Sequence, residues 1–322
     1  MIRTRLYRAG TLALEDFPLA DVSDHIQEED ATVWVDFLNP TLENLSELEE
    51  ELGLHRLAVE DALHDFQRPK LDQYDSHLFL SAYSVSLNRG TGELATHEIK
   101  AFITKRALVT VHKDDFDILA VEKHWDKQPD LIGHGVSYLL WGLLDTVVDG
   151  HFEAVQQLDA AIESLEDDLF NPAPRTVQVQ RRSFELRKSL VLLRRAVLPM
   201  REVVNTLMRR DLDSIDNAMM PYFQDVYDHV LRATEWTESL RDLVSTILDT
   251  NVGLQGNRMN LVMKKVTSWA AIIAVPTAIT GFYGQNVPYP GFSTLWGFWV
   301  SSALIVVISV GLYVTFKRKD WL

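Results

Sequence analysis

The distribution of polar residues divides this chain into a charged part and a long uncharged part. No Asp, Glu, Lys or Arg occurs between Lys265 and Lys317, although charged residues make up 24% of the chain. A membrane-spanning helix needs roughly 20 mainly apolar residues. Two such segments fit here, at 266–282 and 295–316, with residues 283–294 between them. The pattern predicts a hairpin of two transmembrane helices.

The first 135 residues have the pattern of a cytoplasmic α/β domain. A short apolar strand is followed by a helix that starts after Asn39-Pro40-Thr41 and stops at Gly53. Two alternating segments then flank a glycine-containing turn, which indicates a hairpin, and a third strand follows. The predicted strands are 32–38, 78–87, 97–104 and 107–112.

Strand signals stop near residue 136, and apolar residues then recur at helical spacing. The pattern predicts a helical hairpin over 136–220, with a proline-rich turn at 171–174, a second helix over 177–210 and a kink at Pro199. After a proline in its first turn, a stalk helix over 221–265 runs without a stop signal into the first membrane span. Its apolar face needs neighbours, so we expect an oligomer.

Composition and charge restrict the class of protein. The net charge of −15 argues against nucleic acid as a partner, and it suits a protein that handles cations. The absence of cysteine excludes disulfides and cysteine-based zinc sites. The N-terminus lacks the apolar core of a signal peptide, so we expect the large domain in the cytoplasm.

Basic residues flank the two spans, whereas the loop between them has none. Since positive residues stay on the cytoplasmic side, we expect a multi-pass protein of the cell's inner membrane with both termini in the cytoplasm. The tail 317–322 is basic. The basic residues at the ends of the spans are Lys264, Lys265, Lys317, Arg318 and Lys319.

The loop between the spans begins with the polar sequence Tyr283-Gly284-Gln285-Asn286. Mg²⁺ gives up its six waters reluctantly, so a selective pore entrance can hydrogen-bond the hydrated ion through neutral oxygens. A ring of Asn286 side chains offers such oxygens. Gly284 permits close approach of the backbone, or φ values closed to other residues. From these residues alone, the alternative remains that the segment is simply a turn between two helices.

Inward from this loop, small and polar residues recur in steps of three to five, which places them on one helical stripe. We interpret Thr277 and Asn260 as polar pore rings, and Met263 with Val266 as a hydrophobic gate that closes by dewetting. Helix packing through small residues is the alternative. The stripe comprises Asn286, Gly281, Thr277, Ala274, Ala270, Thr267, Met263 and Asn260.

The loop, a second span after it and the basic terminus resemble the CorA family of divalent metal-ion (Mg²⁺/Co²⁺) transporters, whose two-transmembrane members carry Gly-Met-Asn after a tyrosine. The similarity covers nearly the whole chain. The matching segments are Trp34–Phe37 with Pro40-Thr41, Glu60-Asp61 with Gln67–Lys70, Leu198–Val203, Pro221–His229 and Trp321-Leu322. The resemblance implies a funnel-shaped homopentamer in the lipid bilayer, which conducts Mg²⁺, and also Co²⁺ or Ni²⁺, without an organic cofactor. It also implies that the basic residues at the ends of the spans form a ring near the membrane.

The resemblance also implies regulatory Mg²⁺ bound between protomers of the cytoplasmic domain. The matching positions are Asp61, with Glu60 beside it, facing Asp225 of the next subunit, and Asp145 as a further ligand. Carboxylates that meet across an interface repel unless a cation lies between them, so ion binding would couple concentration to subunit packing. Without the resemblance, each is an ordinary surface acid.

Two positions depart from the family pattern. Gln285 replaces the usual methionine, and Ala274 stands where many relatives have a large apolar residue. The first leaves open a zinc transporter of the same family, with or without proton coupling. The second implies that the gate relies more on Met263 and Val266.

An enzyme and a structural membrane anchor are two other classes of protein to compare with this sequence. An enzyme is not expected, because the carboxylates and histidine at 60–65 have loose spacing and no phosphate-binding glycine loop occurs. A structural membrane anchor is the remote alternative. An anchor would have no use for Thr277 and Asn286 on one helical face.

Overall fold

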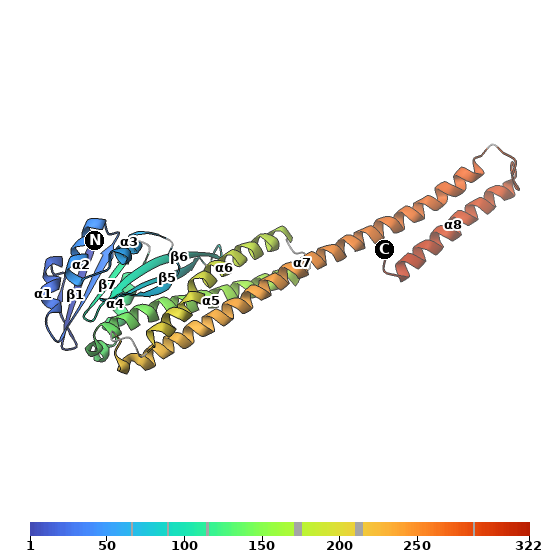
Figure 1. Ribbon diagram of the computed structural model, residues 1–322. Coiled ribbons are helices and arrows are strands. Elements are labelled where there is room, and N and C mark those ends of the chain that lie inside the picture. The colour runs from blue at the N-terminus through green and yellow to red at the C-terminus, as the bar shows by residue number, and fades with distance from the viewer. Residues whose placement is uncertain (66, 89, 114–115, 171–175, 210–214, 286) are drawn as a thin grey trace. The chain divides into compact units, whose positions relative to one another are not determined.

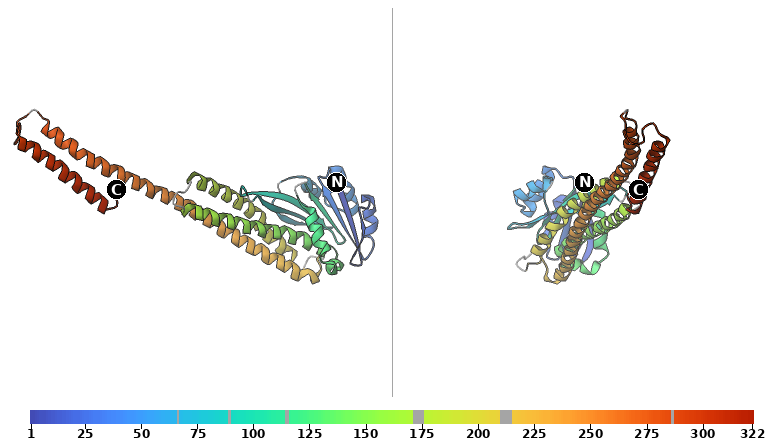
Figure 2. Two further views of the ribbon diagram at one scale, coloured as in Figure 1. Left: turned by 180° about the vertical axis from the view of Figure 1, so that it is seen from behind. Right: turned by 90° about the vertical axis from the view of Figure 1, so that its right-hand side faces the viewer.

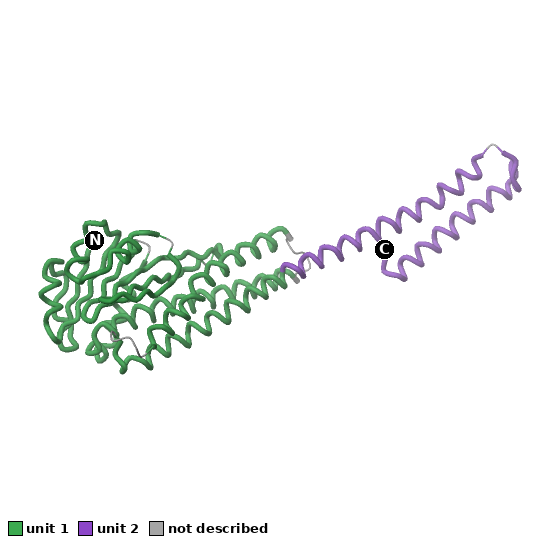
Figure 3. The backbone as a smooth tube through the Cα atoms, viewed as in Figure 1, with its two compact units in different colours: residues 1–247 green, residues 248–322 purple. Residues whose placement is uncertain are grey.

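The protein is described from a computed structural model, which describes residues 1–322 except 66, 89, 114–115, 171–175, 210–214 and 286. The chain divides into two compact units (Figure 3). Unit 1 is residues 1–247 and unit 2 is residues 248–322.

Unit 1 is built on a seven-stranded sheet with the order β2-β1-β3-β7-β6-β5-β4. The strands β3 and β7 pair in parallel, and the other neighbouring pairs are antiparallel. The strands are β1 (Ile2–Arg8), β2 (Thr11–Glu15), β3 (Ala31–Leu38), β4 (Lys70–Gln73), β5 (Leu78–Asn88), β6 (Glu93–Ile103) and β7 (Ala107–His112).

Helices cover both faces of this sheet (Figure 1). Side chains of successive strand residues point to opposite faces, so Ala101 and Ile103 of β6 join one core while Phe102 joins the other. The second core lies under α1 (Val22–Ile26), α2 (Leu42–Leu52) and α3 (Arg56–Leu63). Thr41 caps α2 in a capping box, and Gly53 ends the helix in the left-handed conformation, as the sequence predicts.

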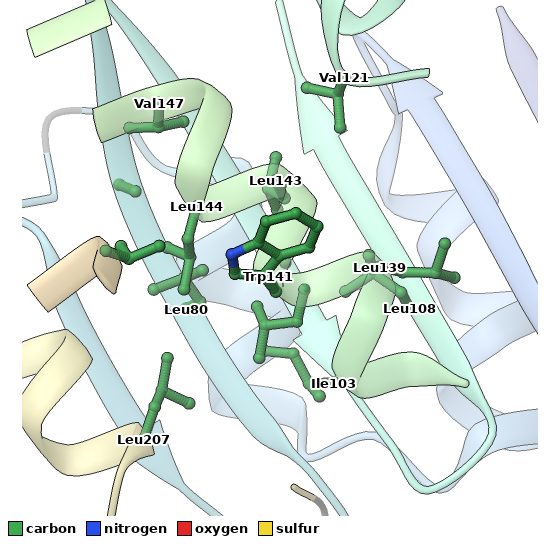
Figure 4. Close-up of a cluster of buried hydrophobic side chains, with 14 of the residues drawn as sticks. Leu80, Ile103, Leu108, Val121, Leu139, Trp141, Leu143, Leu144, Val147 and Leu207 are labelled. Atoms are coloured by element: carbon green, nitrogen blue, oxygen red, sulfur yellow. The ribbon is translucent and has the colours of Figure 1, made fainter. Parts of the chain in front are cut away.

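The larger core lies between the sheet and the long helices. Figure 4 shows Leu139, Trp141, Leu143 and Leu144 of α5 among side chains from the strands, with Leu207 nearby. The helices are α4 (Ile118–Asp126), α5 (Val136–Phe170), α6 (Thr176–Leu207) and α7 (Met220–Tyr283).

Most elements expected from the pattern are present. The strands at 78–87 and 107–112 and the three long helices are confirmed, and Pro199 lies inside α6. The expected helix 177–210 is shorter, since α6 ends at Leu207. The expected turn at 171–174 lies outside the described residues. The pattern missed β1, β2 and β4 and the helices α1, α3 and α4.

Unit 2 contains the last part of α7 and the helix α8 (Leu295–Arg318). Both helices are long and apolar enough to cross a membrane. Within unit 2 they run side by side and are joined by a short loop (Figures 1 and 2). The helix α7 continues without a break through the end of the expected stalk into the expected first span.

Candidate ion path and metal site

The part of α7 in unit 2 has two different faces. Ser268 is fully buried, and Ala271, Ile272 and Ile279 are partly buried. Figures 1 and 2 show α8 beside this segment, so this face is the one that packs within unit 2. The expected pore stripe lies elsewhere, because all its described members are exposed in the single chain: Asn260, Met263, Thr267, Ala270, Ala274, Thr277 and Gly281.

The exposed stripe combines small, polar and flexible apolar side chains. Met263 and Val266 keep 56% and 60% of their surface exposed, which is unusual for apolar side chains unless lipid or a neighbouring chain covers them. The Thr277 hydroxyl donates to the Ile273 carbonyl at 3.1 Å. Donation uses only the hydroxyl hydrogen, so the lone pairs of the oxygen can still accept hydrogen bonds.

A cavity of about 600 Å³ lies at the start of this stripe, and Asn260, Met263 and Lys264 line it. The chain terminus forms its other side: the Trp321 ring stacks on Phe316 at 5.6 Å, and the Lys264 ammonium lies 6.0 Å from the Trp321 ring centroid. The five expected basic residues at the ends of the spans are all exposed. Asn260 therefore lies at a polar and basic end of the hairpin.

The loop between the spans is held by its aromatic residues. The Tyr289 hydroxyl donates to the Tyr283 carbonyl at 2.7 Å, and their rings meet edge to face at 5.0 Å. Gln285 is exposed, while Asn286 lies outside the described residues. The expected role of Asn286 therefore stays a prediction.

Glycine at position 284 lies in close contact with the helix end. A Cβ there would lie 3.0 Å from the Thr280 carbonyl oxygen, which already accepts the Gly284 amide at 2.8 Å. Gly284 does not have a positive φ. Of the two explanations drawn from the sequence, the one based on an unusual φ is wrong.

In unit 1, Asp145 belongs to a cluster of potential metal ligands. Ligand atoms of Asp145, Asp149 and His229 all lie within 4.8 Å of one another. Asp145 and Asp149 are one turn apart on α5, and His229 comes from α7. Asp225 lies one turn before His229, with its carboxylate 3.9 Å from the imidazole Nδ1.

Burial makes Asp145 an unusual carboxylate. Its side chain is only 14% exposed, and burial together with the charge of Asp149 raises its pKa to about 6. The imidazole of His124 lies 3.5 Å away. Two carboxylates around a half-buried position repel each other unless a proton or a cation lies between them, and a set of carboxylates with one imidazole suits divalent metals.

The other two expected metal ligands lie apart from this cluster in the single chain. The Asp61 carboxylate accepts from the Lys70 ammonium at 2.6 Å, and Lys70 also contacts Asp72 at 2.7 Å. Glu60, beside Asp61 on α3, is exposed. Whether Asp61 meets Asp225 of another subunit is a question about the assembly, and that expectation stays a prediction.

The sequence analysis did not identify Asp149 and His229, which belong to the cluster, or His124, which lies beside it. The sequence does contain a signal for the first two residues. Asp149 and His229 each follow one of the expected ligands, Asp145 and Asp225, by four residues, and residues four apart share a helical face. His124 on α4 has no such signal, because only the fold brings α4 to α5.

Comparison with known proteins decides the family. The chain matches the family described as CorA-like Mg²⁺ transporter protein over residues 29–318. The cobalt/magnesium transport protein CorA of Thermotoga maritima is 33% identical over 85% of this chain and 78% of its own length. The chain belongs to the CorA family.

Other similar proteins agree with this assignment. The putative metal ion transporter YfjQ of Bacillus subtilis is 30% identical over 96% of this chain and 94% of its own length. The complete structure of the CorA magnesium transporter from Methanocaldococcus jannaschii superposes with a TM-score of 0.82, at 23% identity, over 100% of this chain and 99% of that chain. This CorA protein is thus a membrane transporter of divalent cations and not an enzyme.

Proteins named as zinc transporters are also similar to this chain. The zinc transport protein ZntB of Yersinia pseudotuberculosis is 24% identical over 79% of this chain and 77% of its own length. Membership of the CorA family alone therefore does not identify the transported ion.

Proposed function

We propose that this CorA protein forms a homopentameric channel for Mg²⁺, which also passes Co²⁺ and Ni²⁺, with selection of the hydrated ion at Tyr283–Asn286. The observation that carries the proposal is the exposed stripe on α7, which faces away from the packed face around Ser268. Small and polar side chains gain nothing from lipid contact, whereas a ring of them can line a water-filled path. The relative from T. maritima is named a cobalt/magnesium transport protein.

Flux measurements test this proposal. Purified protein in proteoliposomes should admit Mg²⁺ at a fixed membrane potential, and Asn286→Ala should abolish the flux while the oligomer stays intact. Gln285→Ala, at the neighbouring position, is the matched control and should change ion preference more than total flux. Absence of flux of any divalent ion in the intact wild-type oligomer would sink the transport proposal and favour a structural anchor.

A zinc transporter is the second candidate. Gln285 in the loop and the imidazole of His229 in the metal cluster favour it, since nitrogen ligands suit Zn²⁺ better than Mg²⁺. The same liposomes separate the two: Zn²⁺ flux without Mg²⁺ flux assigns the protein to zinc transport. Gln285→Met, which gives the common family residue, should then shift preference toward Mg²⁺.

The cluster of Asp145, Asp149 and His229 is our candidate for the cytoplasmic regulatory site, with Asp225 beside it. Glu60 and Asp61 of a neighbouring subunit are expected to complete it. A bound divalent ion would relieve the repulsion between the carboxylates and hold the cytoplasmic domains together, which closes the channel when the ion is abundant. Asp225→Ala should remove the protection from proteolysis that Mg²⁺ confers. If Mg²⁺ removal changes protease sensitivity of this variant as much as that of the wild type, the regulatory role is wrong.

Both termini are expected in the cytoplasm. The chain has no cysteine, so single cysteines report their side of the membrane without background. A cysteine at Ser293 in the loop should react with an impermeant maleimide in intact cells, and a cysteine at Lys319 should react only after permeabilisation. The opposite labelling pattern would show that the termini lie outside the cytoplasm.

A further inference from the structure

The hairpin of α5 and α6 separates its charges between the two helices. Between Val136 and Phe170, α5 has eight Asp and Glu residues and no Lys or Arg. Between Thr176 and Leu207, α6 has seven Lys and Arg residues and two Glu. In a chain with a net charge of −15, a basic helix beside a wholly acidic one is a specific feature of this pair.

The exposed ridge of α6 alternates apolar and basic residues. Val177 is 78% exposed and Phe184 54% exposed, and the basic residues lie between such positions. Residues three and four apart form one line along a helix. The ridge is Val177, Arg181, Phe184, Lys188, Val191 and Arg195, with Arg187 beside it.

Several of these cations have no acidic partner within the described part of the chain. Arg187 and Arg195 form no salt bridge there, whereas Arg181 pairs only with Glu185 of its own helix. At the C-terminal end of the ridge, Arg194, Arg195 and Arg68 line a groove of about 430 Å³. Arg194 contacts Glu238 at 3.3 Å, but no described residue forms a salt bridge with Arg68.

The exposed ridge of α5 is the complement of this surface. Gln156, Ala160, Glu163 and Asp167 lie along it and are all exposed. Glu163 and Asp167 form no salt bridge with any described residue; among those residues, the one such bridge between α5 and α6 joins Asp168 to Arg182 at 3.6 Å. Both ridges therefore point away from their own hairpin. Attraction between the two helices of one hairpin thus does not explain why the ridges carry opposite charges.

We propose that the basic ridge of α6 binds the acidic ridge of α5 of a second copy of this chain. A head-to-tail contact between two different faces closes into a ring under rotational symmetry, and the inference thus rests on the oligomer of the proposed function. The contact differs from the metal cluster, because it uses fixed cations of the protein in place of a bound ion. It would hold neighbouring cytoplasmic domains together when the metal cluster is empty.

The register of this contact follows from the hairpin itself. The two helices are antiparallel (Figure 1), and the Arg182 guanidinium pairs with the Asp168 carboxylate at 3.6 Å, so we infer that these two residues lie at about the same height along the hairpin. A residue five positions further along α6, Arg187, then lies level with Glu163, and Val191 lies level with Asp159 and Ala160. In a ring whose axis runs along the hairpin, rotation keeps these heights, so Arg187 meets Glu163 of the neighbour and Val191 meets Ala160.

Disulfide trapping tests the contact in the full-length, otherwise cysteine-free protein. Two differently tagged chains, one with Ala160→Cys and the other with Val191→Cys, are produced together and oxidised in membranes. We expect a covalent dimer that carries both tags, and none from either variant alone. A dimer of Val191→Cys with itself would mean that α6 meets α6, and it would overturn the proposal, as would no dimer from an intact oligomer.

Charge exchange provides a second measurement. Arg187→Glu should shift the equilibrium from oligomer to monomer by about two- to fivefold per interface, the usual range for an exposed ion pair. Addition of Glu163→Arg should restore the wild-type equilibrium, which a merely structural role of Arg187 would not explain. Ion uptake by the same proteins separates the two proposals: uptake without cross-linking refutes the α5–α6 contact alone, and an intact oligomer without uptake refutes the transport function alone.

Discussion

At the scale of single residues, Asp145 is a carboxylate whose pKa is raised by its environment. Its pKa of about 6 lies above the ordinary value of 3.8 because the side chain is buried beside Asp149. The folded protein thus holds this proton more strongly than the unfolded chain does. The protonated side chain therefore contributes its full stabilisation to the folded state below about pH 4. This contribution is lost as the pH rises through about 6.

Asp145→Asn should therefore stabilise unit 1 in the absence of divalent ions. We expect a gain of about 1–2 kcal/mol in the free energy of unfolding at about pH 7.5 with EDTA, and no gain at about pH 4. Denaturant unfolding at several pH values measures it, with Asp159→Asn on the same helix as the control. Excess Mg²⁺ should reduce or reverse the gain, since the ion stabilises only a protein that binds it. A gain independent of pH would contradict this account.

Gly142 shows how tightly α5 packs against α4. A Cβ at this position would lie 2.5 Å from two ring atoms of the fully buried Trp125. Gly142→Ala should lower the free energy of unfolding by about 1–3 kcal/mol, because the indole cannot move freely. Gly150→Ala in the same helix is the control: its nearest neighbour is the Val85 carbonyl oxygen at 3.8 Å. That change should be neutral or stabilising by up to ~1 kcal/mol, and thermal melts compare the two.

At the scale of elements, the two faces of α7 in unit 2 predict different responses to the same substitution. If the exposed stripe lines a pore, Ala274→Leu in every protomer narrows it and should reduce ion flux on the order of tenfold. Ala303→Leu, an equally exposed position on α8, should leave flux unchanged. Liposome uptake measures both variants, and equal loss in both would mean that the stripe does not line the path.

The strand β1 shows why some elements could not be predicted from the sequence pattern. Its sequence contains Arg3, Arg5 and Arg8, and the fold places Arg5 beside acids of α4, with Glu122 at 3.3 Å and Asp126 at 3.2 Å. The residue is only 9% exposed. A charged side chain becomes tolerable in a covered strand only when a distant element supplies its partners, and no local pattern contains that information.

At the scale of the whole molecule, the two apolar cores described above both lie in unit 1. A fragment of residues 1–247 should therefore fold without unit 2, remain soluble and unfold in one cooperative transition. Circular dichroism and size-exclusion chromatography test this expectation. An aggregated or molten fragment would show that unit 1 needs the membrane part for its stability.

The sequence by itself determined the membrane hairpin and the long helices, because these depend on runs and periods of residue type within one segment, and its motifs resembled those of the family. It also placed Asp145 and Asp225 among the candidate ligands. The tertiary structure alone decided that Asp145, Asp149 and His229 converge from α5 and α7, and that Asp61 pairs with Lys70. It alone decided which face of α7 is packed. These facts depend on distances between segments far apart in the chain, which the packing of helices on the sheet sets and which no local pattern encodes.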